Sequence, residues 1–525
     1  MQSVLNPCLI TVKNYRCFED TSPLRVQLGR EFVALVGQNN SGKSSFLRMF
    51  WELRPLWPAA ASGIASGKGN CGINYQDVPD AEEIFSHKNS RPIQINLAFE
   101  RNNVDLNRQF VSGLVLTANR DQPNHWGFEF QVSDGNAVPP QTYRLENDLL
   151  LAHDRPEIDC GAVLSTLRAL TNVLYIGPFR NAINEGAGNY FDLAIGTSFV
   201  AMWNSWKSGD SHSQMRLVNK ITSDLTHIFE FDRLEINAAA SGKTLKVFVD
   251  GQPYRLSELG AGLSQFIVVL TNAAIRKPAL ILIDEPELNL HPALQLDFLT
   301  SLASYATNGV IFATHSIGLA RSAAEHVYSF QKKQGRAVVR PFEELRNYAE
   351  FAGEMSFSSF KDMGFNALLL VEGIKDVKPV MQLLRNIRKD HRVVVLPLRG
   401  DELARGDAEH ELSELKRISD KVFALVDSER SSQDESPIPA RVGFEATCRS
   451  LGITVCVTKR RALENYFTDT AVKAALGDDF QALGPYQRLS DAARPWSKDK
   501  NWRIARAMAT DSLANTDVGD FLAAI

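Results

Sequence analysis

The residues at positions 36–45 constrain the fold of this chain more than any other stretch. Four of them occupy the fixed positions of the phosphate-binding pattern G-x-x-x-x-G-K-[ST], namely Gly37, Gly42, Lys43 and Ser44. An apolar run at 32–36 precedes the pattern and is typical of a buried strand, and residues 46–50 are typical of a helix start. This order places backbone N–H groups at a helix N-terminus, where they face a polyphosphate. The stretch therefore predicts an α/β nucleotide-binding domain.

The side chains of this loop predict how ATP is held. We expect Lys43 to reach the β- and γ-phosphates and the hydroxyl of Ser44 to bind Mg²⁺. The other loop residues that we expect to contact the nucleotide are Asn39, Asn40, Ser41 and Ser45.

Composition limits the class of protein. The chain has 525 residues, which is enough for about three domains. Its formal net charge of −4 gives no global basic field, so any contact with nucleic acid must come from local patches. Six scattered cysteines without a C-x-x-C pair argue against a zinc site and predict a reducing, cytoplasmic location. No apolar run is long enough to cross a bilayer, so we expect no membrane association.

A second block of nucleotide chemistry lies between residues 256 and 316. An apolar run at 279–283, bounded by prolines, predicts a buried parallel strand that ends in Asp284 and Glu285. We expect Asp284 to bind Mg²⁺ through water, and Glu285 to orient or deprotonate the attacking water. Another buried run ends at His315, which is interpreted as a γ-phosphate sensor.

Three further segments accompany this core. Residues 59–75 are rich in glycine, alanine and serine and predict a flexible loop. Short β-rich runs between 92 and 145 predict an antiparallel β lobe. Residues 181–235 have mainly helical patterns, so we expect a helical insertion there that serves as a dimerisation arm.

The phosphate loop, the glycine turn at 256–265, the acidic stretch at 284–292 and the segment at 313–316 follow one another in a recognisable order. With them the chain resembles the ABC-type ATPases of the SMC, RecF and OLD group. In such ATPases two heads sandwich ATP, and the signature turn of one head contacts the γ-phosphate bound by the other. The resemblance therefore implies a homodimer or higher homo-oligomer. The usual signature is Ser-Gly-Gly, whereas Ser257 here lies before Gly260-Ala261-Gly262, and this departure favours slow hydrolysis with ATP as a gate.

The second half of the chain has a different pattern. Four strand-like runs at 367–371, 393–396, 422–426 and 453–457 alternate with helical segments, which predicts a parallel sheet. In such sheets function is located at the carboxyl ends of the strands. Acidic residues follow all four runs, and they are Glu372, Asp376, Asp401, Asp427, Glu429 and Glu464.

These carboxylates predict a metal site. A single acidic residue at a strand end is usually a solvated loop residue, but four successive strands favour function. Converging carboxylates repel one another and need a cation. Oxygen ligands select Mg²⁺ or Mn²⁺, and two such ions activate water and stabilise the leaving 3′-oxygen in phosphodiester cleavage.

Val371-Glu372-Gly373 with Asp376, followed by Asp427-Ser428-Glu429, resembles a TOPRIM domain. The family pattern has a second aspartate where this chain has Glu429. Glu464 matches the Glu-Asn-Tyr turn of OLD-type TOPRIM domains. The OLD enzymes also carry a late catalytic lysine, and both Lys498 and Lys500 are candidates for it here.

An ATPase followed by a TOPRIM domain in one chain is specific to OLD-family nucleases, which are typical of antiphage defence in Gabija and retron-associated systems. The resemblance implies an ABC-type ATPase domain at 1–360 and a TOPRIM nuclease domain at 361–525. It also implies a nuclease dependent on Mg²⁺ or Mn²⁺, with DNA a better candidate target than RNA, whose cleavage site is gated by ATP. A helicase-like protein, or a reverse transcriptase with its RNA–DNA product, is the implied partner. The alternative is a RecF- or SMC-like DNA clamp in repair whose TOPRIM domain docks without cleaving.

Overall fold

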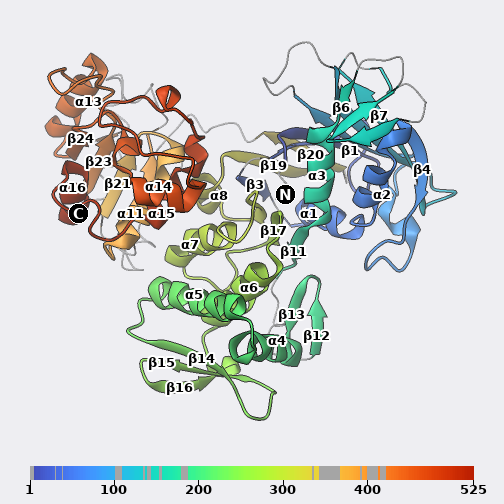
Figure 1. The fold of residues 1–525 in the computed structure, drawn as a ribbon, viewed down its shortest axis with the longest axis horizontal. Helices are drawn as coiled ribbons and strands as arrows, with labels where there is room; N and C mark the ends of the chain where they lie inside the picture. Colours follow the sequence, from blue (N-terminus) through green and yellow to red (C-terminus); the bar gives the residue numbers. More distant parts are fainter. Residues whose placement is uncertain are drawn as a thin grey trace. The chain divides into compact units, whose positions relative to one another are not determined.

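The structure is a computed structural model. It describes residues 5–29, 31–37, 39–100, 109–133, 136–138, 143–152, 157–178, 187–333, 336–341, 367–390, 393–398, 412–413 and 421–525. The described chain divides into two compact units. The first holds the residues up to Ser316 and those from His326 to Pro341, and the second holds Ile317–Glu325 and the residues after 366 (Figure 1). The predicted boundary at 360 lies outside the described residues.

The core of the first unit is a sheet with the strand order β11-β17-β18-β3-β19-β20. Its members are β11 (Val173–Ile176), β17 (Leu280–Asp284), β18 (Val310–Thr314), β3 (Phe32–Gly37), β19 (His326–Lys333) and β20 (Arg336–Pro341). All neighbours are parallel except β19 and β20. Every residue of β17 and β18 is buried, which agrees with the apolar runs that predicted them. Because β3, β17 and β18 are parallel, their carboxyl ends meet at one edge of the sheet.

Three helices continue from the motifs found in the sequence (Figure 1). They are α1 (Lys43–Glu52), α6 (Ala261–Arg276) and α7 (Pro292–Ala303). Helix α1 is amphipathic and buries Phe46, Leu47 and Phe50, so the phosphate loop is attached to a firmly packed helix. Helix α6 is buried over most of its length.

A large, mostly antiparallel sheet forms the predicted β lobe. Its strands are β1 (Cys8–Lys13), β2 (Leu24–Leu28), β4 (Lys68–Gly72), β5 (Ile93–Phe99), β6 (Gln109–Ala118), β7 (His125–Val132), β8 (Arg144–Glu146), β9 (Leu149–Leu151) and β10 (Ile158–Asp159). Helix α3 (Gly161–Thr171) follows them. The expectation of a loop at 59–75 was wrong, because α2 (Leu56–Ser62) and β4 occupy most of it. A Cβ atom on Gly63 or Gly69 would lie within 2.6 Å of the Phe128 ring, so these glycines permit close packing.

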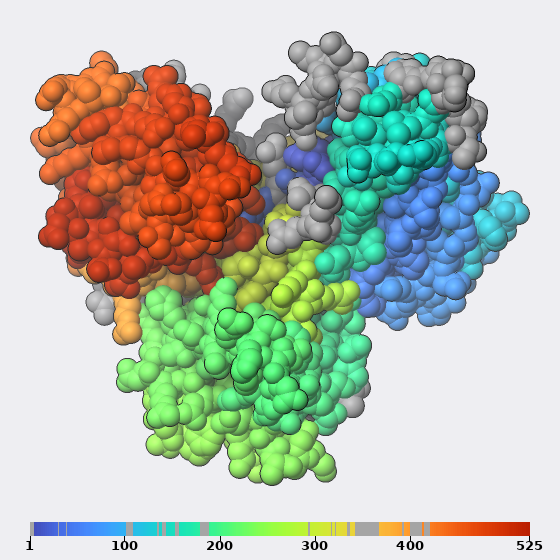
Figure 2. Space-filling model, viewed as in Figure 1, coloured from blue at the N-terminus to red at the C-terminus, as the bar shows by residue number. Residues whose placement is uncertain are grey.

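The segment after residue 187 contains helices, as well as strands that the sequence did not predict. The hairpin β12 (Ala187–Tyr190) and β13 (Leu193–Ile195) leads into α4 (Gly196–Ser208) and α5 (His212–Ile228). A three-stranded antiparallel sheet follows, made of β14 (Leu234–Ala238), β15 (Leu245–Val249) and β16 (Gln252–Arg255). These elements form the green surface of Figure 2. Residues 181–186 of the predicted insertion lie outside the described residues.

The second unit contains a parallel sheet with the order β22-β21-β23-β24. Its strands are β21 (Ala367–Val371), β22 (Val393–Pro397), β23 (Val422–Val426) and β24 (Thr454–Val457). Its helices are α8 (Ile317–Ala323), α11 (Ile374–Asn386), α13 (Pro439–Ser450), α14 (Asp469–Leu476), α15 (Asn501–Ala507) and α16 (Asp517–Ala524). The first strand in sequence lies between the second and third, which makes a topological switch point beside β21.

The predicted fold class, α/β with a β lobe and a second parallel α/β region, is confirmed. None of the helices that the structure describes is both long and apolar enough to span a lipid bilayer.

Candidate functional site

The phosphate loop between β3 and α1 has the backbone that its glycines permit. Gly42 has φ 104° and Asn40 has φ 60°, both in the left-handed region. A Cβ atom on Gly42 would lie 2.8 Å from Sγ of Cys17, and one on Gly37 would lie 2.1 Å from the carbonyl oxygen of Phe330. Both positions therefore need glycine, because a side chain would collide with the elements that pack against the loop.

The loop residues differ in their access to solvent. Asn39, Asn40 and Ser44 are exposed and Ser45 is half-buried, whereas Ser41, Gly42 and Lys43 are buried. Nζ of Lys43 donates a hydrogen bond to the carbonyl oxygen of Gly37 at 2.7 Å. The Lys43 side chain is thus folded back against its own phosphate loop.

Asp284 lies at the carboxyl end of β17 and is 2% exposed. Burial raises the pKa of this carboxyl to about 6, and a hydrogen bond from Ser44 opposes that rise. Burial also lowers the pKa of the Lys43 ammonium, and the negative charges of Asp284, Glu285 and Glu287 oppose that shift. The structure therefore brings Lys43, Ser44 and Asp284 together. A buried carboxylate beside a hydroxyl is a suitable oxygen donor set for Mg²⁺.

The ends of β17 and β18 also bring Glu285 and His315 together. Nε2 of His315 lies 3.3 Å from Oε1 of Glu285. The backbone of Glu285 has φ 54°, which is unusual for a residue other than glycine. Such backbone conformations often occur at functional sites. Oε1 of Glu287 accepts hydrogen bonds from the hydroxyl of Thr314 at 2.7 Å and from the His315 N–H at 2.8 Å. Sequence reasoning assigned no role to Glu287, which positions the histidine segment through these two contacts.

The glycine turn at 256–265 forms the start of α6. Gly260 is the N-cap, and Gly260 and Ala261 are exposed. Ser264 is buried, and its hydroxyl donates to the carbonyl oxygen of Leu256 at 3.0 Å. Gly260-Ala261-Gly262 is therefore the part of this turn that lies at a helix N-terminus, whereas Ser257 lies in the preceding 3-10 turn (Leu256–Glu258).

In the second unit, Glu372 lies directly after β21 and bridges two segments. Its Oε1 pairs with Nη2 of Arg441 at 2.6 Å, and its Oε2 accepts the N–H of Asp427 at 3.2 Å. The guanidinium of Arg441 also donates to the carbonyl oxygen of Asp427 at 3.1 Å. Burial raises the pKa of Glu372, and Arg441 opposes the rise.

Asp376 lies in the first turn of α11, on the side of Glu372. Its Oδ2 accepts the N–H of Gly373 at 3.0 Å, while its Oδ1 is buried without a hydrogen-bond partner. Burial raises the pKa of Asp376 to about 7, Lys498 opposes the rise, and Glu464 and Glu372 add to it. An unpaired buried carboxylate oxygen is costly, which indicates a site completed by a cation or water.

Asp427, Glu464 and Lys498 complete the cluster. Oδ1 of Asp427 accepts the N–H of Leu463 at 2.9 Å, and Nζ of Lys498 lies 2.8 Å from Oε1 of Glu464. Burial raises the pKa of Asp427, and Glu464, Asp376 and Glu372 raise it further. The carboxylates raise the pKa of Lys498 in spite of its burial. Of the two candidate lysines, Lys498 pairs with the predicted site carboxylate Glu464.

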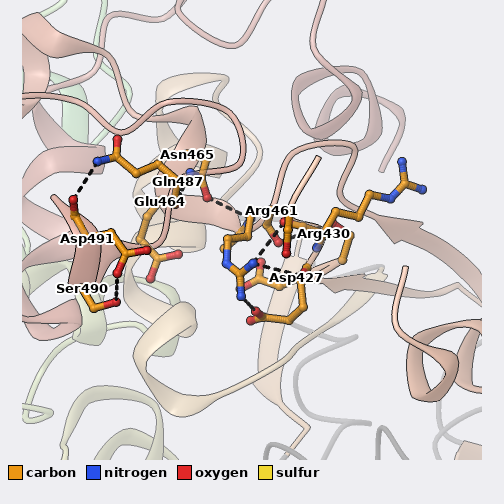
Figure 3. Close-up of polar contacts among 12 residues, drawn as sticks. Asp427, Arg430, Arg461, Glu464, Asn465, Gln487, Ser490 and Asp491 are labelled. Carbon is orange, nitrogen blue, oxygen red and sulfur yellow. Dashed lines mark hydrogen bonds and ion pairs between the residues drawn. The ribbon is translucent and has the colours of Figure 1, made fainter. Parts of the chain in front are cut away.

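Glu429 lies near enough to this cluster to raise the pKa of Glu372, but a separate cation pairs with it. Its carboxylate forms an ion pair with Arg461, whose guanidinium also donates to the carbonyl oxygens of Glu429 and Arg430 at 3.1 Å. Figure 3 shows Arg461 turned toward the loop that carries Asp427, and the Arg430 side chain extending away from it. Asp401, the remaining predicted ligand, lies outside the described residues.

The cluster formed by Glu372, Asp376, Asp427 and Glu464 fits a divalent cation by charge. The charges of Glu372 and Glu464 add to the rise that burial causes in the pKa of Asp376 and of Asp427, and one buried oxygen of Asp376 lacks a partner. Within the described ranges, no three acidic, histidine or cysteine side chains are close enough to enclose a metal ion as they stand. Two of the four carboxylates are instead paired with cations of the chain, Glu372 with Arg441 and Glu464 with Lys498.

Comparison with known proteins gives three results. A family model described as "AAA domain, putative AbiEii toxin, Type IV TA system" matches residues 32–321. The chain is 22% identical to the OLD nuclease of Thermus scotoductus over 432 residues, covering 73% of this chain and 74% of that protein. It is 24% identical to the Old nuclease of Escherichia phage P2 over 422 residues, covering 72% and 69%.

Among solved structures, the SMC head domain from Thermotoga maritima is similar with a TM-score of 0.34 and 14% identity. That similarity covers 65% of this chain and all of the head domain.

Proposed function

This chain belongs to the AAA-domain family whose model covers residues 32–321, and from that premise we propose that it is an ATP-hydrolysing nuclease of the OLD type. It cleaves phosphodiester bonds, more readily in DNA than in RNA, and depends on Mg²⁺ or Mn²⁺. One observation carries the proposal. A single chain holds both a complete phosphate loop beside Asp284 and Glu285 and a buried carboxylate cluster beside Lys498. The two OLD nucleases that it resembles align with most of its length.

In the ATPase, the contacts around the phosphate loop and at the ends of β17 and β18 support a role for each residue. Lys43 exchanges its hydrogen bond to Gly37 for the β- and γ-phosphates, and Ser44 with Asp284 would hold Mg²⁺. Glu285 orients the attacking water and accepts its proton. His315 contacts Glu285 and senses the γ-phosphate, while Glu287 holds the histidine backbone in place.

In the nuclease, Glu372, Asp376, Asp427 and Glu464 would hold the divalent ions. Such ions, when bound, supply an activated water and neutralise the leaving 3′-oxygen. Lys498 donates an N–H toward the charge that develops on the phosphate, because it is the ammonium that faces these carboxylates. Arg441 orients Glu372 and the backbone of Asp427.

The finer parts of the proposal follow the family resemblance. The second region, 361–525, is a TOPRIM domain, and the first, 1–360, is an ABC-type head that dimerises around ATP. The segment at 181–235 serves as the dimerisation arm. ATP binding gates the nuclease site, and the protein acts in the cytoplasm in antiphage defence. Its partner is a helicase-like protein or a reverse transcriptase with its RNA–DNA product.

The test is cleavage of supercoiled plasmid and of total tRNA by the full chain with Mg²⁺ or Mn²⁺, with and without ATP. Glu372→Gln is expected to abolish cleavage while ATP hydrolysis persists, and Lys43→Ala is expected to abolish the effect of ATP. Matched controls are Glu445→Gln and Lys68→Ala, which alter exposed ion pairs in the same two units. Cleavage by Glu372→Gln at the wild-type rate would contradict the nuclease assignment.

The alternative, a DNA clamp with a non-cleaving second domain, is favoured by one observation. Arg441 and Lys498 pair with Glu372 and Glu464, and Arg461 pairs with Glu429, so part of the acidic charge at this site is already neutralised without a metal. Calorimetric titration of Mn²⁺ into the full chain separates the two functions. Binding that is lost in Asp427→Asn supports the nuclease, and no binding supports the clamp.

A further inference from the structure

The tip of the β12–β13 hairpin carries a buried carboxylate, that of Asp192. The side chain of Asp192 is 3% exposed. Its Oδ1 accepts from Nη1 of Arg54 at 2.9 Å and pairs with Nη1 of Arg276. Its Oδ2 accepts from Nη2 of Arg54 at 2.5 Å and from the N–H of Tyr175 at 2.8 Å. A carboxylate has about four lone-pair sites, so these contacts fill it and leave no position for a ligand.

Two partners of Asp192 come from the far ends of helices that carry nucleotide motifs, and the third comes from a strand that pairs with the strand of Asp284. Arg54 lies two residues after α1, which begins at Lys43 of the phosphate loop. Arg276 is the last residue of α6, which begins at the signature turn. Tyr175 lies in β11 and pairs with Leu282 of β17, the strand that ends at Asp284.

Both helices are suited to carry a displacement from one end to the other. Helix α6 has 16 residues and so spans about 24 Å at 1.5 Å per residue. Helix α1 has 10 residues and packs an apolar face onto the core. Interiors of this kind transmit strain because they are close-packed. Asp192 therefore joins the end of α1 to the end of α6 through one shared carboxylate.

The hairpin tip is held in a conformation that needs its surroundings. Phe191 has φ 50°, and its ring packs edge-on against Trp51 at 5.9 Å and Tyr175 at 4.9 Å between ring centres. A Cβ atom on Gly177 would lie 2.4 Å from the Phe191 ring, so the glycine makes room for it. A non-glycine residue stays in this region of φ only when its neighbours determine its position.

We propose that Asp192 is a positioning residue that couples the phosphate-loop helix α1 to the signature helix α6. Nucleotide bound at the loop thereby sets the position of Gly260-Ala261-Gly262, the turn expected to contact the ATP of a second head. This inference rests on the proposed ATP hydrolysis by paired heads, and it names a residue that does not contact the nucleotide.

The experiment removes one of the two arginine contacts of Asp192 and leaves the phosphate loop unchanged. Arg276→Gln is the main variant, since the arginine is 31% exposed and its loss leaves the Arg54–Asp192 pair intact. Asp192→Asn and the double variant test whether the two residues act as one unit. Arg233→Gln is the matched control, because that arginine forms an exposed ion pair with Glu235 in the same unit.

Three quantities are measured on the full chain: the dissociation constant for ATP, the ATP turnover at rising protein concentration, and the amide exchange of residues 261–265 with and without nucleotide. For Arg276→Gln we expect an affinity within about twofold of wild type and a turnover reduced by about 5- to 150-fold, the range of typical coupling energies. The nucleotide-dependent change in exchange at 261–265 is expected to disappear. The double variant should be no slower than Asp192→Asn alone.

Turnover within twofold of wild type in Arg276→Gln would overturn the inference. So would a parallel fall of affinity, turnover and unfolding midpoint, since that pattern marks general destabilisation. If the wild type does not hydrolyse ATP, the proposed function fails, but the exchange measurement still decides the coupling. A response at 261–265 in wild type that is absent in Arg276→Gln supports it, and no response in either protein refutes it.

Discussion

The nucleotide site and the carboxylate site are built in opposite ways. The nucleotide site takes most of its ligands from one continuous stretch, and Asn39, Asn40 and Ser44 are exposed to solvent. The carboxylate site draws Glu372, Asp427, Glu464 and Lys498 from distant segments, and it buries Asp427 and Glu464. The first site is shaped by backbone and stays open, because N–H groups and a helix terminus need no partner side chains. The second contains internal cations, because gathering carboxylates away from water is costly unless opposite charges accompany them.

This contrast predicts that a single cation matters most in the second site. Lys498→Ala is expected to lower cleavage by about 100- to 1,000-fold, because the ammonium faces the buried carboxylates where the phosphate must bind. ATP hydrolysis should stay unchanged. The measurement is plasmid cleavage, with Lys500→Ala as the control at the other candidate lysine. Equal losses in the two variants would show that the structure does not distinguish the lysines.

In the nucleotide site the largest effect is expected from the water-orienting carboxylate. Glu285→Gln should reduce ATP turnover by about 100-fold or more, the usual contribution of a general base. Binding of ATP should persist, since Lys43 and the loop backbone are untouched. Turnover and nucleotide affinity measured on the same preparation check this. A loss of affinity instead of turnover would assign Glu285 to binding.

Divalent metal is expected to stabilise the chain through the carboxylate site. At 100 times its dissociation constant, Mn²⁺ should add about 2.7 kcal/mol to the free energy of unfolding of the unit that binds it. That is a rise of a few degrees in the unfolding midpoint. The Asp427→Asn variant should show no such rise. The measurement is the unfolding midpoint by calorimetry, with and without Mn²⁺ and in the absence of ATP. A rise that survives this substitution would place the metal elsewhere.

The smallest effect is expected at Glu429. Because its carboxylate is paired with Arg461, Glu429→Gln should change cleavage by no more than about threefold, within the modest value of partly exposed ion pairs. Asp427→Asn, two residues away, should abolish it. Cleavage rates of the two variants at saturating Mn²⁺ give the comparison. An equal loss of cleavage in the two variants would indicate that Glu429 is a metal ligand.

Several parts of this picture followed from sequence patterns, and others did not. The buried strands at 280–284 and 310–314 were predicted because a fully buried strand is uniformly apolar. The segment at 59–75 was misinterpreted, because its glycines allow the Phe128 ring to pack closely and do not mark a loop. The pairing of Glu429 with Arg461 was not predicted, since these residues lie 32 positions apart. Asp192 was missed for the same reason, because its partners are distant in sequence.

The sequence by itself determined the phosphate loop, the order of its partner motifs and the presence of acidic residues after the strands of the second half. These are local patterns, and the periodicity and backbone needs of nearby residues are enough to specify them. The tertiary structure alone decided which carboxylates share a site, which lysine faces them and which residue links α1 to α6. Those outcomes depend on burial and on charges brought together from distant segments, and only the packed chain creates them.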